Sequence, residues 1–472
     1  MKNAAPLLSP VRLEKAVLLH VGLLLLGASW VYGGNIWWMR SALGACACLG
    51  GLLTLATFFQ PGDPGRDARR KAWWLLPWLL FVLLVAASCL NPSFFPVTSE
   101  GRTLLVHLGS AHPDLPSTVS PRLTLRELAF GAGVYLAAFN LLLAVRSRRA
   151  LRRLLVFGVA NAVALAVFGT IQKLSSQGFY FGAETSPNVR FFATFIYNNH
   201  WGAFMILWLA VSAGLVFHQA AHHRARDLWH SPAPLTIVGA LVLAVSAPVS
   251  ASRSATVMAG LIVTLVIVHA LGRIAAHRRA LRLPAWPPVL ALLAFSALAL
   301  GATGWLAQRS INARYTETRA ALTQNQSLFE GRLELYRDTW KLARQKPVFG
   351  WGLESYGTAF MLIRPRPLEA NRQYEASYVE AHSDWLQSVA ETGFAGTALL
   401  LLMAVLPLLS LRRGSLGQPL VTYPLLGCAV VALYAWVEFP FANGAVLIAF
   451  WTLYFAALRL ARLHAGAETP AA

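Results

Sequence analysis

Three arginines lie in short polar segments beside long apolar runs, where a charged side chain needs a partner or water. Arg190 precedes one such run, Arg253 lies in a tight turn between two others, and Arg332 falls within a long polar stretch. A guanidinium donates two parallel hydrogen bonds to phosphate, so arginines that converge on one place would bind a diphosphate. The alternative for each arginine is a side chain that reaches to lipid headgroups or pairs with a nearby carboxylate.

The segment Glu380-Ala-His-Ser-Asp384 contains the best candidate for acid–base chemistry. The imidazole of His382 accepts a proton near neutral pH, and Glu380 or Asp384 would orient it. A surface histidine on a hydrated loop is the simpler explanation of the same residue. Asn199, just before the apolar run at 200–217, would line a polar pocket, although a helix N-cap explains it about as well.

Motifs for other chemistries are missing from the sequence. It contains no two acidic residues separated by a single residue, so it lacks the usual pair of carboxylate ligands for a divalent metal. It also lacks HExxH, a Walker loop, a Gly-x-Ser-x-Gly elbow and a dinucleotide fingerprint. We therefore expect no metal site, no cofactor, no hydrolase and no ATP-driven pump. Arginines would have to carry the charge in any phosphate chemistry.

The elements that must position these residues are membrane helices. The chain of 472 residues is 56% hydrophobic and only 13% charged, about half the charged fraction of soluble domains. Runs of about 20 apolar residues are long enough to span a bilayer. We predict an all-α polytopic membrane protein with about twelve spans, at 16–33, 36–59, 72–90, 127–145, 154–172, 200–217, 235–250, 254–272, 286–306, 392–411, 419–437 and 443–461.

The distribution of basic residues orients these spans. The net charge is +20, from 40 Lys+Arg against 20 Asp+Glu, and in a soluble protein this excess would suggest nucleic acid. Here the basic residues concentrate in alternate turns, such as 66–71, 146–153 and 273–282, and such turns are cytoplasmic in membrane proteins. We therefore expect both termini in the cytoplasm, membrane lipids as the surroundings and no nucleic-acid partner.

A long polar stretch at 307–391 separates the ninth and tenth spans. It holds half of the acidic residues of the chain, and Leu333, Tyr336 and Trp340 recur at helical spacing. With the termini inside, this large helical loop is external, so any active site faces outside. The predicted regions are a bundle of nine spans at 1–306, the loop at 307–391, and three spans with a tail at 392–472.

Several blocks of this loop follow one another in an order that resembles the signature of the O-antigen ligase and O-antigen polymerase superfamily. The blocks are Gly331–Trp340, Pro347–Leu353, Ala381-His382 and Glu391–Gly396, with similar blocks upstream at Arg190–His200 and Ser250–Ser254. The resemblance implies a GT-C-like helical glycosyltransferase of the bacterial inner membrane. Such proteins move a glycan from undecaprenyl diphosphate to an acceptor hydroxyl at the periplasmic face, without a metal or a nucleotide sugar.

The resemblance also implies roles for individual residues. Arg190 and Arg332 match arginines that hold the diphosphate, and His382 matches the histidine that acts on the acceptor hydroxyl. Arg253 matches a recurrent arginine of less defined role. The histidine of the family is often followed by Asn, whereas Ser383 and Asp384 follow here, so Asp384 is an alternative base or an orienting group.

Two main reactions fit this signature and differ in the acceptor, and a ligase that attaches the glycan to a protein is a third version. A ligase would attach a glycan to lipid A–core, whereas a polymerase would extend a growing glycan of O-antigen, exopolysaccharide or capsule. A twelve-helix transporter would need ionisable residues at mid-membrane, and the predicted spans contain almost none. A non-catalytic scaffold for envelope assembly would tolerate replacement of Arg190, Arg332 and His382.

Overall fold

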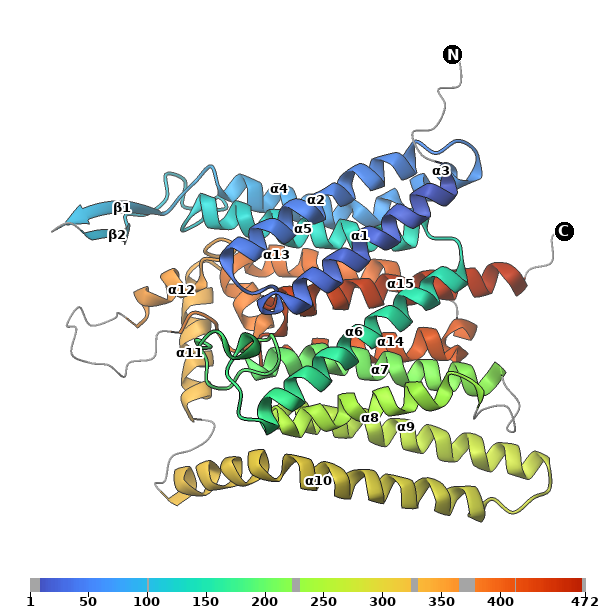
Figure 1. Cartoon of the computed structure of the whole chain (residues 1–472). Coiled ribbons are helices and arrows are strands. Elements are labelled where there is room, and N and C mark those ends of the chain that lie inside the picture. The colour runs from blue at the N-terminus through green and yellow to red at the C-terminus, as the bar shows by residue number, and fades with distance from the viewer. Residues whose placement is uncertain are drawn as a thin grey trace.

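The computed structural model describes residues 9–99, 102–222, 230–323, 330–364, 378–411 and 413–468. Long helices run side by side through most of the molecule (Figure 1). The α-helices are α1 (Pro10–Trp30), α2 (Trp37–Phe58), α3 (Asp63–Arg70), α4 (Leu76–Ser88), α5 (Pro121–Ala144), α6 (Arg148–Leu174), α7 (Asn198–His222), α8 (Ala233–Val249), α9 (Arg253–Ala280), α10 (Trp286–Thr323), α11 (Glu330–Gln345), α12 (Tyr356–Ala359), α13 (Asp384–Leu408), α14 (Pro419–Tyr434) and α15 (Gly444–Glu468). Short 3-10 helices are η1 (Tyr32–Gly34), η2 (Ala72–Leu75), η3 (Tyr180–Gly182), η5 (Phe360–Leu362), η6 (Arg413–Gly417) and η7 (Pro440–Ala442).

The predicted spans all coincide with helices. Within the described residues, eight helices are long and apolar enough to cross a membrane, and the pair formed by α3 and η2–α4, bent by 40°, would make nine. The eight are α2, α5, α6, α7, α9, α10 up to Gln308, α13 and α15. The helices α8 and α14 also match predicted spans but have only 17 and 16 residues. A multi-pass helical membrane protein is thereby confirmed, and the count of twelve spans stays a prediction.

Two elements differ from the expected pattern. The helix α10 continues beyond its apolar part to Thr323, so the stretch at 307–391 begins inside a helix. An antiparallel hairpin of β1 (Phe94–Ser99) and β2 (Arg102–His107) follows α4, where only a loop was expected. Four of the six residues of β1, Phe94, Phe95, Val97 and Thr98, are of the aromatic and β-branched types that favour strands. Residues 324–329 and 365–377 of the predicted loop lie outside the described part.

The bundle has two distinct ends. The helices α11 and α12 and the hairpin lie at one end, called the site end below (Figure 1). The start of α1 and the end of α15 lie at the opposite end, called the terminal end (Figure 1). The two ends of the described chain therefore lie on the same side of the bundle, as an even number of crossings would place them.

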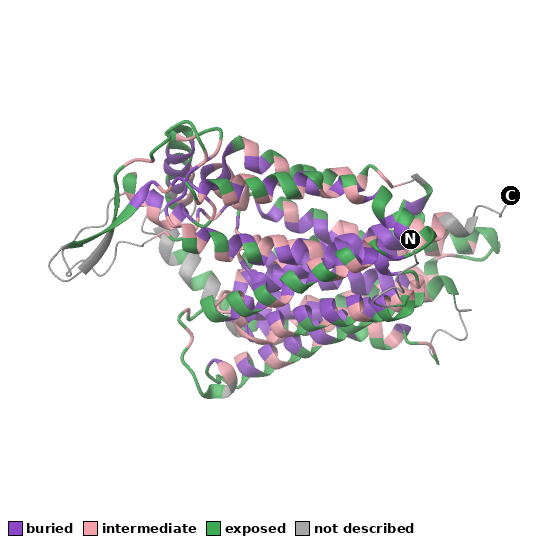
Figure 2. Ribbon diagram, turned by 90° about the horizontal axis from the view of Figure 1, so that it is seen from above, coloured by how far each residue is buried: buried purple, intermediate pink, exposed green. Residues whose placement is uncertain are grey.

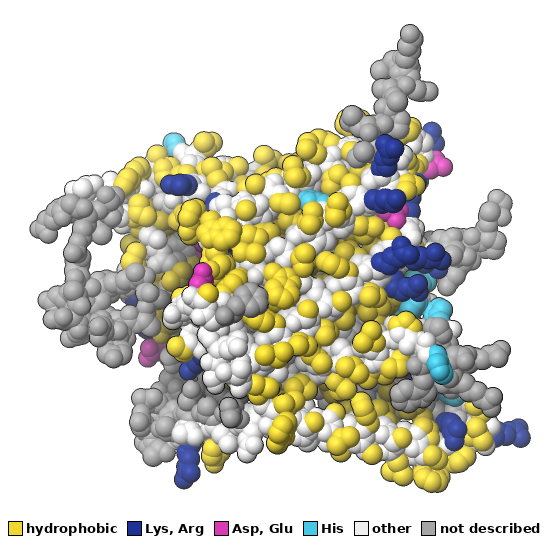
Figure 3. Space-filling view, in the orientation of Figure 1, with side chains coloured by type: hydrophobic (Ala, Val, Ile, Leu, Met, Phe, Trp, Pro, Cys, Tyr) yellow, Lys and Arg dark blue, Asp and Glu magenta, His cyan; other side chains and the backbone are white. Residues whose placement is uncertain are grey.

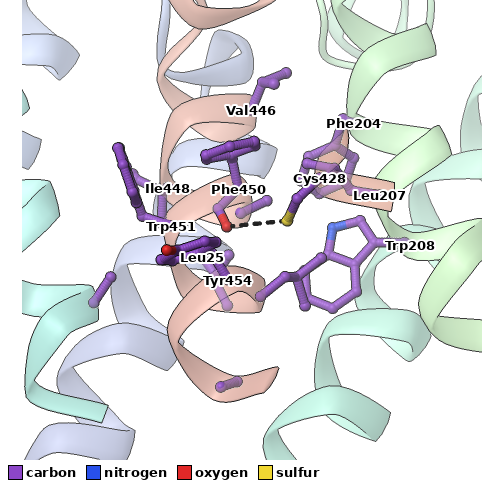
Figure 4. Packing of buried hydrophobic residues seen from close by; sticks show 14 of the residues in the cluster. Leu25, Phe204, Leu207, Trp208, Cys428, Val446, Ile448, Phe450, Trp451 and Tyr454 are labelled. Carbon is purple, nitrogen blue, oxygen red and sulfur yellow. Dashed lines mark hydrogen bonds between the residues drawn. The ribbon is translucent and has the colours of Figure 1, made fainter. Parts of the chain in front are cut away.

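Close packing holds the centre of the bundle, where buried residues concentrate (Figure 2). Trp208 of α7 is fully buried, and it lies beside Cys428 of α14 and near Phe450 of α15, where the Cys428 thiol donates to the Phe450 carbonyl at 3.6 Å (Figure 4). Small residues allow other helices to approach: a Cβ on Gly133 of α5 would lie 3.0 Å from Ala47 of α2. Between membrane helices such van der Waals contact replaces the hydrophobic effect.

Gly393 interrupts α13 at the point where the preceding loop docks. Its φ of +66° is a left-handed conformation that favours glycine, and a Cβ there would lie 2.2 Å from the Val348 carbonyl oxygen. The N–H groups of Phe394 and Ala395 donate to the carbonyls of Pro347 and Val348 at 2.8 and 3.1 Å. Two of the blocks singled out in the sequence are therefore the two halves of one joint between loop and bundle.

Replacing Gly393 with alanine should open this joint and lower the thermal stability. The left-handed backbone alone costs a residue with a Cβ about 1–3 kcal/mol, and the contact with Val348 adds to that. Thermal unfolding of the detergent-purified chain measures the effect. Gly260→Ala is the matched control because a Cβ there meets no atom within 4 Å. Equal Tm values for the two variants would show that the conformation of Gly393 and its contact with Val348 do not stabilise the fold.

Candidate functional site

A buried carboxylate, Glu438, forms the centre of a polar cluster at the site end. It lies in the link between α14 and η7, and its side chain is only 3% exposed. One oxygen, Oε1, accepts from Arg332 Nη2 at 2.5 Å and from Asn199 Nδ2 at 2.8 Å. The other, Oε2, lies 3.6 Å from His382 Nδ1, an ion-pair distance when the imidazole is protonated. The structure thus brings three predicted site residues, each from a different part of the chain, onto one carboxylate.

The guanidinium of Arg332 is fixed by two partners and remains 39% exposed. Besides Glu438 it contacts the Val437 carbonyl, which accepts from Nη1 at 3.0 Å. Burial would lower the pKa of Arg332, but the charge of Glu438 raises it above the ordinary value. Burial would likewise raise the pKa of Glu438, but His382 and Arg332 lower it. Both partners of this pair are therefore ionised at neutral pH.

The Glu438 carboxylate should make stability depend on pH in a defined direction. Its folded pKa lies below the ordinary 4.5, so the ionised form stabilises the fold above about pH 4.5. That contribution is lost as the pH falls through the lowered pKa. We expect the Tm of the native chain to fall more steeply below pH 4.5 than that of Glu438→Gln, measured by thermal unfolding from pH 7 to pH 3. The control Asp63→Asn removes a carboxylate that is 97% exposed, so its Tm should depend on pH as that of the native chain does. If the Tm of Glu438→Gln also falls with pH as steeply as that of the native chain, the Glu438 carboxylate does not cause the pH dependence.

The His382 ring is positioned from both its backbone and its side chain. The backbone has a φ of +52°, a strained conformation for a residue other than glycine that persists only where the surroundings fix it. Here the Tyr336 hydroxyl donates to the His382 carbonyl at 2.9 Å, and the next residue, Ser383, caps α13. The imidazole stands edge-on to the Phe439 ring, with centroids 4.7 Å apart. It is 29% exposed, so a ligand has access to it.

Asp384 has a different environment from His382. Its Oδ2 accepts from the N–H of Phe441 at 2.8 Å, and its own N–H donates to the Ala435 carbonyl at 2.9 Å. No hydrogen bond joins Asp384 to His382 among the described residues. The carboxylate therefore braces the link between α14 and α15, the same link that carries Glu438.

The remaining predicted residues lie around this centre. Asn199 connects it to the turn before α9, because its Oδ1 accepts from Ser252 Oγ at 2.6 Å while its amide also donates to the Tyr197 hydroxyl at 2.7 Å. Arg253 follows Ser252 directly and has an exposed side chain. Arg190 is also exposed. Burial raises the pKa of the Tyr197 hydroxyl, and the charge of Arg190 is one of the influences that oppose this rise. The charge of Arg190 thus reaches Tyr197, which is hydrogen-bonded to Asn199 of the cluster, and Arg253 adjoins Ser252, which is hydrogen-bonded to the same asparagine.

A second group of charges lies at the same end and connects the first spans to the loop. Arg40 of α2 donates to Glu127 of α5 and to the Ala442 carbonyl, both at 2.6 Å. Arg126 also donates to Glu127, at 3.1 Å, and its Nη2 lies 3.7 Å from Glu354. The hydrogen bond from Arg40 to Ala442 fixes the position of η7, which begins two residues after Glu438. Within the described part of the chain, no three His, Cys, Asp or Glu side chains are arranged to hold a metal ion.

Glu380 introduces a second pH dependence, opposite in sign to that of Glu438. Its Oε2 is buried with no hydrogen-bond partner in the part of the chain that the structure describes, and burial together with the charge of Glu354 raises its pKa to about 7. Because the folded pKa lies above the ordinary 4.5, the fold loses stability as the pH rises from 4.5 through 7. Glu380→Gln should therefore have a higher Tm than the native chain at pH 8 and an equal Tm at pH 4.5. A lower Tm for the variant at pH 8 would contradict this.

Glu438 is the residue that sequence reasoning missed. It follows the predicted span at 419–437 and precedes the one at 443–461. An acidic residue between two spans, in a chain with only 20 acidic residues, is a signal that could have identified it. Its partner Arg332 is 106 positions away along the chain, so no local pattern joins the two.

The fold and the site define a multi-pass helical membrane protein with an arginine- and histidine-containing site at one end of its bundle. Residues 238–401 match the family model described as O-antigen ligase. The match covers about a third of the chain and includes Arg253, Arg332 and His382. It confirms the predicted resemblance to the O-antigen ligase and polymerase superfamily, and it supports a ligase- or polymerase-type function on glycan and lipid-linked substrates in general. No curated protein matches the chain.

Proposed function

We propose that the chain is a metal-independent glycosyltransferase of the bacterial inner membrane. It moves a glycan from undecaprenyl diphosphate to an acceptor hydroxyl at the periplasmic face. The observation that carries the proposal is the convergence of Arg332 and His382 on Glu438, at the end of the bundle opposite the start of α1 and the end of α15. In this proposal Arg332 is the phosphate-binding group and His382 is the proton acceptor, and both lie within the residues that match the family model.

In this proposal, arginines bind and neutralise the diphosphate. Diphosphate leaves readily once its charge is neutralised, so no strong general acid is required. Arg332 is held in place by Glu438 and Val437 before the donor arrives, and fixed donors aimed at developing charge contribute a few kcal/mol each to transition-state stabilisation. Arg190 and Arg253, exposed beside the cluster, would also bind the diphosphate of the donor.

His382 is the proposed base. Glu438 lies beside Nδ1, which favours the tautomer with its proton on that nitrogen and leaves Nε2 to take the proton of the acceptor hydroxyl. The acceptor oxygen then attacks the anomeric carbon as the bond to the diphosphate oxygen breaks. Attack opposite the leaving group inverts the anomeric centre, so a product with retained configuration would contradict a single displacement. Asp384, occupied with the backbone of Phe441, is a positioning residue in this scheme.

The acceptor distinguishes a ligase from a polymerase. In cells that lack the chain, glycan polymer on the lipid carrier together with bare lipid A–core indicates a ligase, the version the family description favours. Single repeat units on the core, or the loss of a capsule, indicate a polymerase. Complementation with the native chain should restore the surface-glycan ladder. An unchanged ladder in the deletion would remove both versions and favour a transporter or a scaffold.

A further inference from the structure

Basic side chains are buried at the terminal end, where α15 passes the bend between α3 and η2. This bend, residues 71–76, is called the elbow below. Lys71 lies in that elbow and is only 4% exposed, and Arg459 of α15 is 8% exposed. Lys71 Nζ lies 2.5 Å from Asp67, and the Arg459 guanidinium donates to the Val145 carbonyl. Charges this deeply buried are stable only with enough counter-charge nearby.

The described carboxylates do not balance these charges. The described charges with the largest influence on Arg459 are Asp67, Glu14, Arg462 and Arg146. The Asp67 side chain is 54% exposed and is already paired with Lys71, and Glu14 accepts from the backbone N–H of Arg146 at 3.1 Å. With Lys71 and Arg459 included, this set of described residues contains four cations and two carboxylates. In Figure 3, Lys and Arg side chains gather at this end of the molecule.

Two buried hydrogen-bond donors at the same place have no acceptor. The guanidinium of Arg462 lies over the Trp74 ring, with its central carbon 4.3 Å from the ring centroid. Trp74 is 5% exposed, and among the described residues neither its Nε1 nor the Arg462 Nε has a hydrogen-bond partner. Buried donors without acceptors are rare in folded proteins. An anion with several acceptor oxygens would neutralise the surplus positive charge and accept hydrogen bonds from these donors.

We propose that this corner, formed by Lys71, Trp74, Arg459 and Arg462, binds the phosphate group of an anionic phospholipid. A phosphate supplies both the negative charge and the acceptor oxygens that the corner lacks. The neighbouring surface suits acyl chains, because Trp73 and Leu76 of the same elbow are 56% and 54% exposed. Basic sites between helices near a membrane surface are a known form of lipid headgroup recognition. This inference does not depend on the proposed glycan transfer.

Thermal unfolding of the purified full chain in a neutral detergent tests the site. Phosphatidylglycerol should raise the Tm of the native chain, and phosphatidylcholine should not. Arg462→Gln should bind phosphatidylglycerol about five- to tenfold more weakly, since each basic side chain near such a headgroup contributes about that factor. Arg279→Gln removes an equal charge from an exposed position on α9 and should keep the native response.

Trp74→Phe provides a second variant that keeps the ring and removes the N–H donor. It should fold like the native chain and bind the lipid more weakly. If millimolar inorganic phosphate stabilises the native chain as well as phosphatidylglycerol does, and Arg462→Gln loses this effect, the site is an anion site that takes free phosphate. An equal response of the native chain to both lipids, or a full phosphatidylglycerol response in Arg462→Gln, would overturn the proposal.

Discussion

Arg332→Ala should reduce glycan transfer by about 10²–10³-fold per folded molecule. The magnitude is that of removing one fixed donor aimed at charge that develops in a transition state. Arg332 meets this description because Glu438 and the Val437 carbonyl hold it in place while its guanidinium remains partly exposed. Initial rates of transfer to an acceptor by the purified chain measure the effect.

Two further variants separate a lost phosphate contact from a lost fold. Arg337→Ala removes an arginine from an exposed position of the same helix, α11, and should transfer at the native rate. Arg332→Ala leaves the Glu438 carboxylate buried beside one fewer cation, which is destabilising. Adding Glu438→Gln to Arg332→Ala should therefore recover Tm but not transfer. Recovery of transfer in the double variant would mean that Arg332 acts only by neutralising Glu438.

His382→Gln should reduce transfer by about 10²–10⁴-fold, the usual contribution of a positioned acid–base group. Glutamine keeps a polar side chain of similar size but cannot take the proton of the acceptor hydroxyl. The loss should appear in the chemical step, so the variant should still bind the lipid-linked donor. Donor binding and single-turnover transfer, measured separately, distinguish these two effects.

Asp384→Asn is the informative companion of His382→Gln. Because the amide oxygen of asparagine can still accept from the N–H of Phe441, the link that carries Glu438 should stay braced, and the Tm of Asp384→Asn should stay close to that of the native chain. At temperatures where both variants are folded, Asp384→Asn should retain more transfer than His382→Gln. Full transfer by His382→Gln together with its loss in folded Asp384→Asn would identify Asp384 as the base.

Apolar runs predicted the helices well because a bilayer demands about 20 apolar residues for each crossing. Apolar runs do not predict the secondary structure of segments outside the predicted spans. The continuation of α10 to Thr323 is polar, so hydropathy gives no sign that the helix persists. The hairpin at 94–107 is short, and strands of this length are poorly separated from loops by periodicity.

The candidate site was partly predictable because Arg332, His382 and Asn199 lie in recognisable blocks. Their convergence was not predictable, because it requires four parts of the chain to meet at one end of the bundle. These parts are α7, α11, the segment before α13 and the link after α14. The same applies to Arg40 and Glu127, which are paired at 2.6 Å although they belong to different helices. Such long-range pairs follow from tertiary packing, which a single sequence does not reveal.

The most direct test is transfer by the purified chain in the presence of a metal chelator. The substrates are a glycan on undecaprenyl diphosphate and an acceptor from the same cells, with glycosylated acceptor and released undecaprenyl diphosphate as the readouts. The account predicts that both products form together with the native chain, and that both fall by at least about 10²-fold with Arg332→Ala and with His382→Gln. Product formation at the native rate by both variants, or none by the folded native chain, would contradict it.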